Sequence, residues 1–151
     1  MARRIIIEVL LILVLTILLA WTVLGAFALT DSADPVGTFV DQTPRVLFGL
    51  LGIGLALWAI LLIIGAIVYR RRPAGWRVAT HLFSLLVALA VNIGVFALVT
   101  AAAGGSGGED WGMLVVAIAG AAAAAVFVAG VVVVLVVELL VLPKLGEPAN
   151  T

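Results

Sequence analysis

The chain lacks cysteine and is poor in charge. With no cysteine among its 151 residues, it can form no disulfide, thiolate metal site or cysteine nucleophile, and it cannot be S-palmitoylated. Charged residues make up only 11% of the sequence, far below the share of about 25% in soluble domains. Eight basic and eight acidic side chains cancel to a net charge of zero, so the overall charge indicates no nucleic-acid partner.

Side chains that bind cofactors are scarce as well. His81 is the only histidine, and the only methionines are Met1 and Met113, so a haem held by two histidines is excluded. The glycine-rich run at residues 104–108 follows no predicted strand and has no lysine beside it, which argues against a phosphate-binding loop. We therefore expect no cofactor, no metal site and no catalytic residue.

Apolar sequence is what the chain has in abundance. Hydrophobic residues make up 66% of it, and the mean hydropathy is +1.39. A helix of roughly 20 apolar residues crosses a bilayer core about 30 Å thick, and the longest polar connection, residues 30–45, is too short to form a core of its own. The sequence predicts an all-α integral membrane protein, a single four-transmembrane-helix bundle over residues 1–151, with spans at about residues 5–29, 46–69, 78–103 and 111–142.

Basic residues predict the orientation of this bundle. Because short cytoplasmic loops carry an excess of lysine and arginine, we expect both termini in the cytoplasm (N-in/C-in).

We expect that the first apolar stretch is not cleaved off as a signal peptide, since its apolar run exceeds the usual signal-peptide core of about 7–15 residues. Richness in alanine, glycine and valine is typical of high-GC bacteria and indicates the plasma (inner) membrane. With alternating crossings Arg45 lies alone on one side, and the other seven basic residues share the opposite side: Arg3, Arg4, Arg70, Arg71, Arg72, Arg77 and Lys144.

The absence of cysteine allows a direct test of this orientation. Single cysteines introduced at Ser32 and at Ser106 should react with a membrane-impermeant thiol reagent in intact cells, because both positions fall in predicted outer loops. A cysteine at Ala74, in the predicted inner loop, should react only after the membrane is opened. The reverse labelling pattern would show that the bundle is inserted the other way round.

Proline positions predict where the spans begin and end. Thr43 and Pro44 read as the N-cap and first residue of the second span, because a proline there loses no helical hydrogen bond. Asp34 and Pro35 repeat the pattern, which leaves two alternatives for the first outer loop, a short helical turn or an irregular loop. Pro143 is expected to end the fourth span, since proline breaks the hydrogen bonding of a helix interior.

Small residues predict where helices contact one another, because transmembrane helices associate through close backbone approach. In the fourth span Ala117, Ala121, Ala125 and Ala129 recur every four residues, and Gly49, Gly52, Gly54 and Ala56 form a similar pattern in the second. We expect both sets to be helix-contact surfaces. The pattern leaves open whether the neighbouring helix belongs to this chain or to another subunit.

Asn92 is the deepest strongly polar group, about 22 Å along its helix from Arg77. Polar side chains inside spans are the usual sign of function, because burying them is unfavourable unless they find partners. We expect Asn92 to make an interhelical hydrogen bond worth about 1 kcal/mol or less. A contact with a ligand or substrate is the alternative.

Glu8, His81 and Glu138 form the second candidate site, at the predicted cytoplasmic end. A proton or cation carrier would hold two carboxylates and an imidazole close together. The simpler hypothesis is ion pairing at the membrane interface, between Glu8 and Arg4 at i,i+4 and between Glu138 and an arginine of residues 70–77. We favour ion pairing, because the four spans offer no protonatable relay through the midplane.

The sequence therefore predicts a structural or accessory subunit, or a self-associating bundle, without catalysis of its own. Its partners would be the bilayer and other membrane subunits or further copies of itself. A small oligomeric transporter or channel is the alternative, and it requires a polar cavity reaching Asn92. An intramembrane enzyme is the second alternative, and it requires a pocket around Ser84 and His81.

In topology alone the chain resembles small multidrug exporters and fluoride channels, but small multidrug exporters place a carboxylate deeper in the first helix than Glu8.

Overall fold

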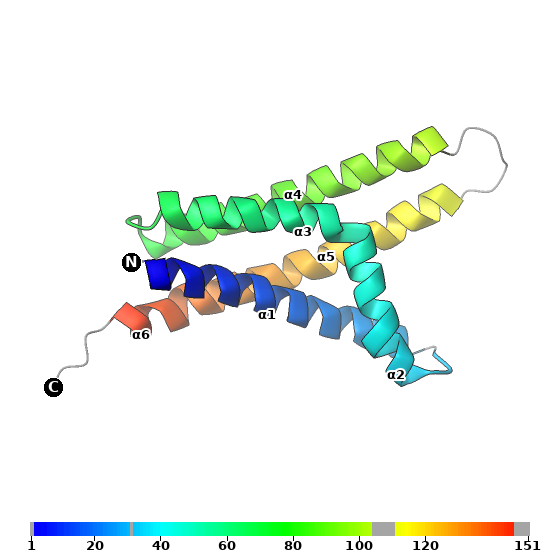
Figure 1. Cartoon of the computed structure of the whole chain (residues 1–151), viewed down its shortest axis with the longest axis horizontal. Coiled ribbons are helices and arrows are strands. Elements are labelled where there is room, and N and C mark those ends of the chain that lie inside the picture. The colour runs from blue at the N-terminus through cyan, green and yellow to red at the C-terminus, as the bar shows by residue number, and fades with distance from the viewer. Residues whose placement is uncertain (1, 31, 104–110, 147–151) are drawn as a thin grey trace.

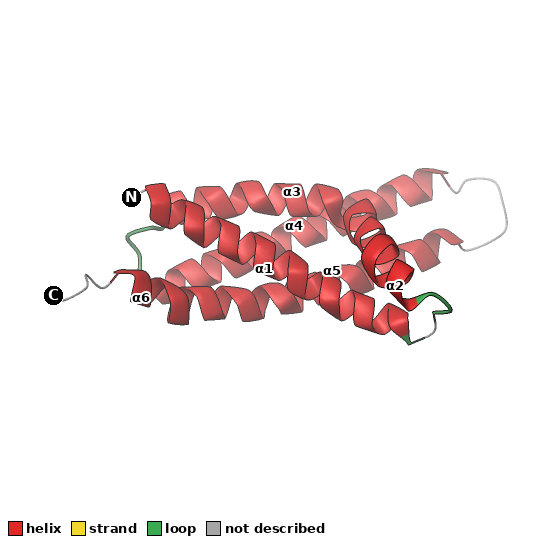
Figure 2. Ribbon diagram, turned by 60° about the horizontal axis from the view of Figure 1, so that its bottom comes forward, coloured by secondary structure: helices red, strands yellow, loops and turns green. Residues whose placement is uncertain are grey.

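The computed structural model describes residues 2–30, 32–103 and 111–146. Among these residues 93% are helical and none lies in a strand (Figure 2). The elements in chain order are α1 (Ala2–Leu29), α2 (Pro35–Gly37), the π-helical turn η1 (Thr38–Gln42), α3 (Thr43–Val68), α4 (Ala74–Ala103), α5 (Trp111–Val136), the π-helical turn η2 (Val137–Val141) and α6 (Leu142–Gly146).

Four of the helical segments are long and apolar enough to cross a membrane, as the sequence predicts. The long helices run lengthwise beside one another, whereas α2, η1 and the start of α3 cross that direction near the end of α1, and α4 and α5 extend beyond them (Figure 1). The start of α1, the turn between α3 and α4, and α6 meet at the opposite end. We call this the basic end, because it carries Arg3, Arg4, Arg70, Arg71, Arg72, Arg77 and Lys144.

The second long helix begins earlier than predicted. It starts at Pro35, where the Asp34 Oδ1 atom accepts a hydrogen bond of 3.1 Å from the Gly37 amide, and the prediction of Thr43 as the N-cap is wrong. Pro44 has no amide hydrogen and its ring would clash with the carbonyl four residues before it. The chain accommodates it by widening into η1, in which the Thr43 amide donates to the Thr38 carbonyl.

A π-helical turn also lets the last helix continue past Pro143, so the prediction that this proline ends the span is wrong as well. The π-helical turn η2 ends two residues before Pro143, as η1 ends two residues before Pro44. In η2 the Leu142 amide donates to the Val137 carbonyl, one residue further back than in an α-helix. Widening before the proline removes the clash, and the helix continues into α6.

Only part of the predicted small-residue face serves contacts inside the bundle. Ala129 is buried and Ala125 half-buried, but Ala117 and Ala121 are exposed. A four-residue repeat turns about 40° around an α-helix at each step, so the stripe leaves the contact side. The buried face of α5 instead includes a series with alternating steps of three and four residues: Ala119, Ala122, Val126, Ala129 and Val133.

Two of the glycines predicted as contacts in α3 also face outward. Gly49 is exposed and Gly52 half-buried, and a Cβ atom built on either would meet nothing within 4 Å. Neither glycine is therefore a close contact within this chain, and contact with another subunit stays a prediction. Within the predicted set the close approach falls at Gly54, where a Cβ atom would lie 2.7 Å from the Cβ atom of Asn92.

Candidate functional site

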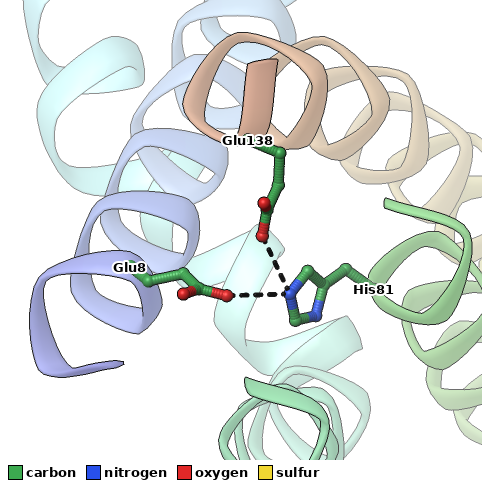
Figure 3. A group of neighbouring side chains, drawn as sticks. All are labelled: Glu8, His81 and Glu138. Atoms are coloured by element: carbon green, nitrogen blue, oxygen red, sulfur yellow. Dashed lines mark hydrogen bonds and ion pairs between the residues drawn. The ribbon is translucent and has the colours of Figure 1, made fainter. Parts of the chain in front are cut away.

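Four ionisable side chains from three helical segments meet inside the basic end of the bundle. We call Glu8 of α1, Arg77 and His81 of α4, and Glu138 of η2 the polar cluster. Figure 3 shows the carboxyl groups of Glu8 and Glu138 pointing toward the same edge of the His81 ring. The exposed fractions are 3% for Glu8, 7% for Arg77, 1% for His81 and 0% for Glu138. The cluster is therefore part of the bundle interior.

The distances define a chain of contacts through the cluster. The His81 Nε2 atom lies 3.2 Å from the Glu8 Oε1 atom and 3.3 Å from the Glu138 Oε1 atom. The other carboxylate oxygen of Glu138 pairs with the Arg77 Nη2 atom at 2.7 Å. Each carboxylate thus faces a nitrogen from α4, and α4 is tied to α1 on one side and to η2 on the other.

The local fold explains why these side chains converge. Arg77 and His81 are four residues apart on α4, so they project from the same face of that helix. Glu138 lies on the buried face of the last helix, one helical turn beyond Val134, in the π-helical turn that precedes Pro143. Gly65 of α3 lies against the opposite edge of the imidazole, where a Cβ atom would come within 3.5 Å of Nδ1.

This arrangement corrects the ion pairing expected from the sequence. Glu138 does pair with an arginine of residues 70–77, namely Arg77. Glu8 contacts His81 instead of Arg4, which is exposed. The expected pairs were weak interfacial ones, whereas the observed groups are buried, so each of them depends on its partners for the polar contacts that water would otherwise supply.

The cluster is suited to sharing a proton. With a neutral imidazole carrying its hydrogen on Nε2, one N–H can be shared between the two carboxylates. Two carboxylates and one guanidinium then give a formal charge of −1, and one additional proton brings the cluster to zero. The formal charge of the cluster is therefore −1 with a neutral His81 and zero with a protonated His81.

A metal ion fits the same residues less well. One ligand atom each from Glu8, His81 and Glu138 lies within 4.8 Å of the others, which is close enough for a shared ion. A metal-bound imidazole almost always donates its second N–H to a carboxylate, carbonyl or water, but His81 Nδ1 has no hydrogen-bond partner among the described residues. Arg77 also already occupies one oxygen of Glu138 and would repel a cation.

Asn92 is engaged by the backbone of α3. Its side-chain amide donates to the Leu50 carbonyl at 2.8 Å, and its Oδ1 atom accepts from the Gly54 amide at 2.7 Å. Leu50 and Gly54 are four residues apart, the spacing of hydrogen-bonding partners in an α-helix. Asn92 therefore bonds to both the carbonyl and the amide of one such pair. With 4% of Asn92 exposed, its polar atoms are used in contact between α3 and α4.

Sequence reasoning missed two features of these contacts. One is the choice of Arg77 among the arginines of residues 70–77, although its spacing of four residues from His81 could have indicated a shared face. The other is the hydrogen bond of Trp21, whose indole N–H donates to the Phe39 carbonyl at 2.7 Å. In η1 the Thr43 amide bonds to Thr38 instead of Phe39, which leaves the Phe39 carbonyl free for Trp21.

The geometry needed by an intramembrane serine enzyme is not formed at Ser84. Its hydroxyl donates to the Thr80 carbonyl of its own helix at 2.8 Å, and His81 directs Nε2 at the two carboxylates.

No family model, curated protein or solved structure matches this chain. The polar cluster and the hydrogen bonds of Asn92 to α3 are therefore the observations on which a function can be proposed.

Proposed function

We propose that this protein is a structural or accessory subunit of a membrane assembly, or a self-associating helix bundle, without catalysis of its own. The observation that carries the proposal is that its strongly polar buried groups face one another or the backbone of a neighbouring helix. The polar cluster ties α1, α4 and η2 together, and Asn92 ties α4 to α3. Such contacts favour one arrangement of the helices.

The proposed setting is the bacterial plasma membrane, with both termini in the cytoplasm. Both ends of the described chain and the turn between α3 and α4 lie at the basic end (Figure 1). Seven of the eight basic residues belong to that end, and Arg45 belongs to the other. The positive-inside rule assigns such an end to the cytoplasm.

An outward groove supports assembly with another transmembrane helix. It lies between α1 and α5, encloses about 340 Å³ and is lined only by apolar side chains. Alanines on its α5 wall let a neighbouring backbone approach closely, which is how transmembrane helices associate. We propose that the occupant is a helix of another subunit or of a second copy. The lining comprises Leu19, Val23, Phe27, Ala121, Ala124, Ala125, Val128, Ala129 and Val132.

A matched pair of alanine substitutions tests this assembly surface. Ala121→Leu fills the groove from an exposed position, so it should leave the fold stable and reduce the population of the assembled state. Ala123→Leu adds the same bulk to a site that is 4% exposed, so it should destabilise the bundle by about 1–3 kcal/mol. Native mass spectrometry in mild detergent measures assembly, and denaturant titration measures stability. Unchanged assembly in Ala121→Leu would mean that this face contacts lipid.

Proton or cation transport is the second candidate, and the grouping of Glu8, His81 and Glu138 favours it. Transport would also need a polar path beyond the cluster, and Asn92, the deepest polar group, is closed off against α3. We expect liposomes containing the purified wild-type protein to show no ion or proton flux above that of empty liposomes. A flux that is lost in Glu8→Gln would overturn the structural role and establish transport.

A further inference from the structure

A second polar site lies beside the cluster, in a cavity at the basic end. The cavity measures about 170 Å³. Four guanidinium groups reach it from three segments: one from α1, two from the turn between α3 and α4, and one from the first turns of α4. Its lining consists of Arg4, Ile5, Glu8, Arg70, Arg71 and Arg77.

The positive charge of this cavity is largely uncompensated. Among the described residues the only ion pair of these arginines joins Arg77 to Glu138, and Arg4, Arg70 and Arg71 are exposed. Glu8 is the single acidic group of the lining, and its carboxylate faces His81 (Figure 3). Four arginines and one glutamate give the lining a formal charge of +3, and the Glu138 carboxylate paired with Arg77 lowers it to +2.

Arg77 supplies an independent sign of a missing partner. Its side chain is 9% exposed, and its Nε atom is buried without a hydrogen-bond partner among the described residues. A guanidinium presents five donors in a planar fork, and a buried donor left unpaired is unfavourable. Arg77 lines the cavity, so an anion there could accept from its remaining donors while the Nη2 atom stays on Glu138.

We propose that this cavity binds the phosphate group of an anionic membrane lipid. Guanidinium groups match phosphate oxygens through paired hydrogen bonds, and basic pockets between transmembrane helices hold lipid headgroups. The cavity lies where the candidate spans begin and end: one span starts at Arg3, another ends at Val68 and a third starts at Ala74. A headgroup at that depth keeps its acyl chains beside the apolar helices.

Arginines next to the cavity provide a control, because they distinguish a specific binding site from the general excess of basic residues at this end. Arg3 and Arg72 belong to the same segments as Arg4 and Arg71, are exposed and do not line the cavity. The positive-inside rule requires charge at this end of the bundle, but it does not require particular arginines to converge. Removing either pair changes the net charge by the same amount, so only a specific site distinguishes the two pairs.

The experiment compares the variants Arg4→Gln/Arg71→Gln and Arg3→Gln/Arg72→Gln. Each protein is placed in phosphatidylcholine bilayer discs doped with phosphatidylglycerol, and native mass spectrometry counts the phosphatidylglycerol retained on release. Retention should fall about tenfold for each cavity arginine removed, because each removal takes away charge-assisted hydrogen bonds to the phosphate. It should stay at the wild-type level in the Arg3/Arg72 variant. All four positions are exposed, so we expect both variants to remain folded, and thermal unfolding measures this.

Inorganic phosphate distinguishes a lipid headgroup from a free anion. It is added to wild-type protein in discs of phosphatidylcholine alone, and the melting temperature is measured. Stabilisation by phosphate without retention of phosphatidylglycerol would overturn the lipid assignment in favour of a soluble anion. Equal losses of retention in the two double variants, or equal retention of phosphatidylcholine and phosphatidylglycerol by the wild type, would overturn the site itself.

Discussion

Replacing Glu138 with glutamine is expected to lower the free energy of unfolding by about 3–5 kcal/mol. The carboxylate is completely buried and pairs with Arg77 at 2.7 Å, so the substitution leaves a buried guanidinium without its counter-charge. It also removes one of the two carboxylates that face His81. Unfolding by a denaturing detergent in mixed micelles, followed by circular dichroism, measures the change.

A double variant shows whether the lost ion pair is the cause. Arg77→Gln/Glu138→Gln removes both charges and should recover much of the stability, because the unpaired buried charge is gone. Arg45→Gln serves as the control, since Arg45 is exposed at the other end of the bundle. A Glu138→Gln protein as stable as the wild type would contradict the burial of this pair.

Replacing Gly54 with alanine is expected to destabilise the bundle by about 1–3 kcal/mol. The added methyl group would lie 2.7 Å from Asn92 Cβ and 3.0 Å from its Cγ atom. These atoms sit close to the backbone of α4 and cannot swing away as the tip of a long side chain can. The helices α3 and α4 must therefore separate, which lengthens the hydrogen bonds of Asn92 to Gly54 and Leu50.

Gly52→Ala provides the matched control in the same helix. A Cβ atom there meets nothing within 4 Å, so alanine should be neutral or slightly stabilising, as expected from its higher helix propensity. Denaturing-detergent titrations of both variants, with Asn92→Leu alongside, measure the effect. Equal effects of Gly54→Ala and Gly52→Ala would mean that α3 and α4 do not approach closely at Gly54.

The predicted effect of removing Glu138 differs between sequence and structure by several-fold. An exposed ion pair contributes about 1 kcal/mol or less, and that is the value for the interfacial pairing expected from the sequence. Burial changes the estimate, because water no longer solvates the charge that remains. Burial of Glu138 follows from the packing of η2 against α1 and α4, which the local sequence around Glu138 does not specify.

The four long apolar helices could be predicted because their signal is local. Each depends on a continuous run of apolar residues, and the length of such a run can be read without knowing its neighbours. The proline predictions failed for a related reason. Pro44 and Pro143 carry a strong local signal for a helix end, but a π-helical turn before each proline keeps the helix intact at the cost of one altered hydrogen bond.

By itself the sequence determined the number and approximate extent of the long apolar helices and the gathering of basic residues at one end, since both are properties of runs along the chain. Only the tertiary structure decided which groups meet. Glu8 and His81 are 73 residues apart and touch at 3.2 Å, and Asn92 reaches Gly54 across 38 residues. Such contacts depend on how far each helix is rotated about its axis. That rotation is set by packing against three other helices at once, and the periodicity of a single span is too uniform to indicate it.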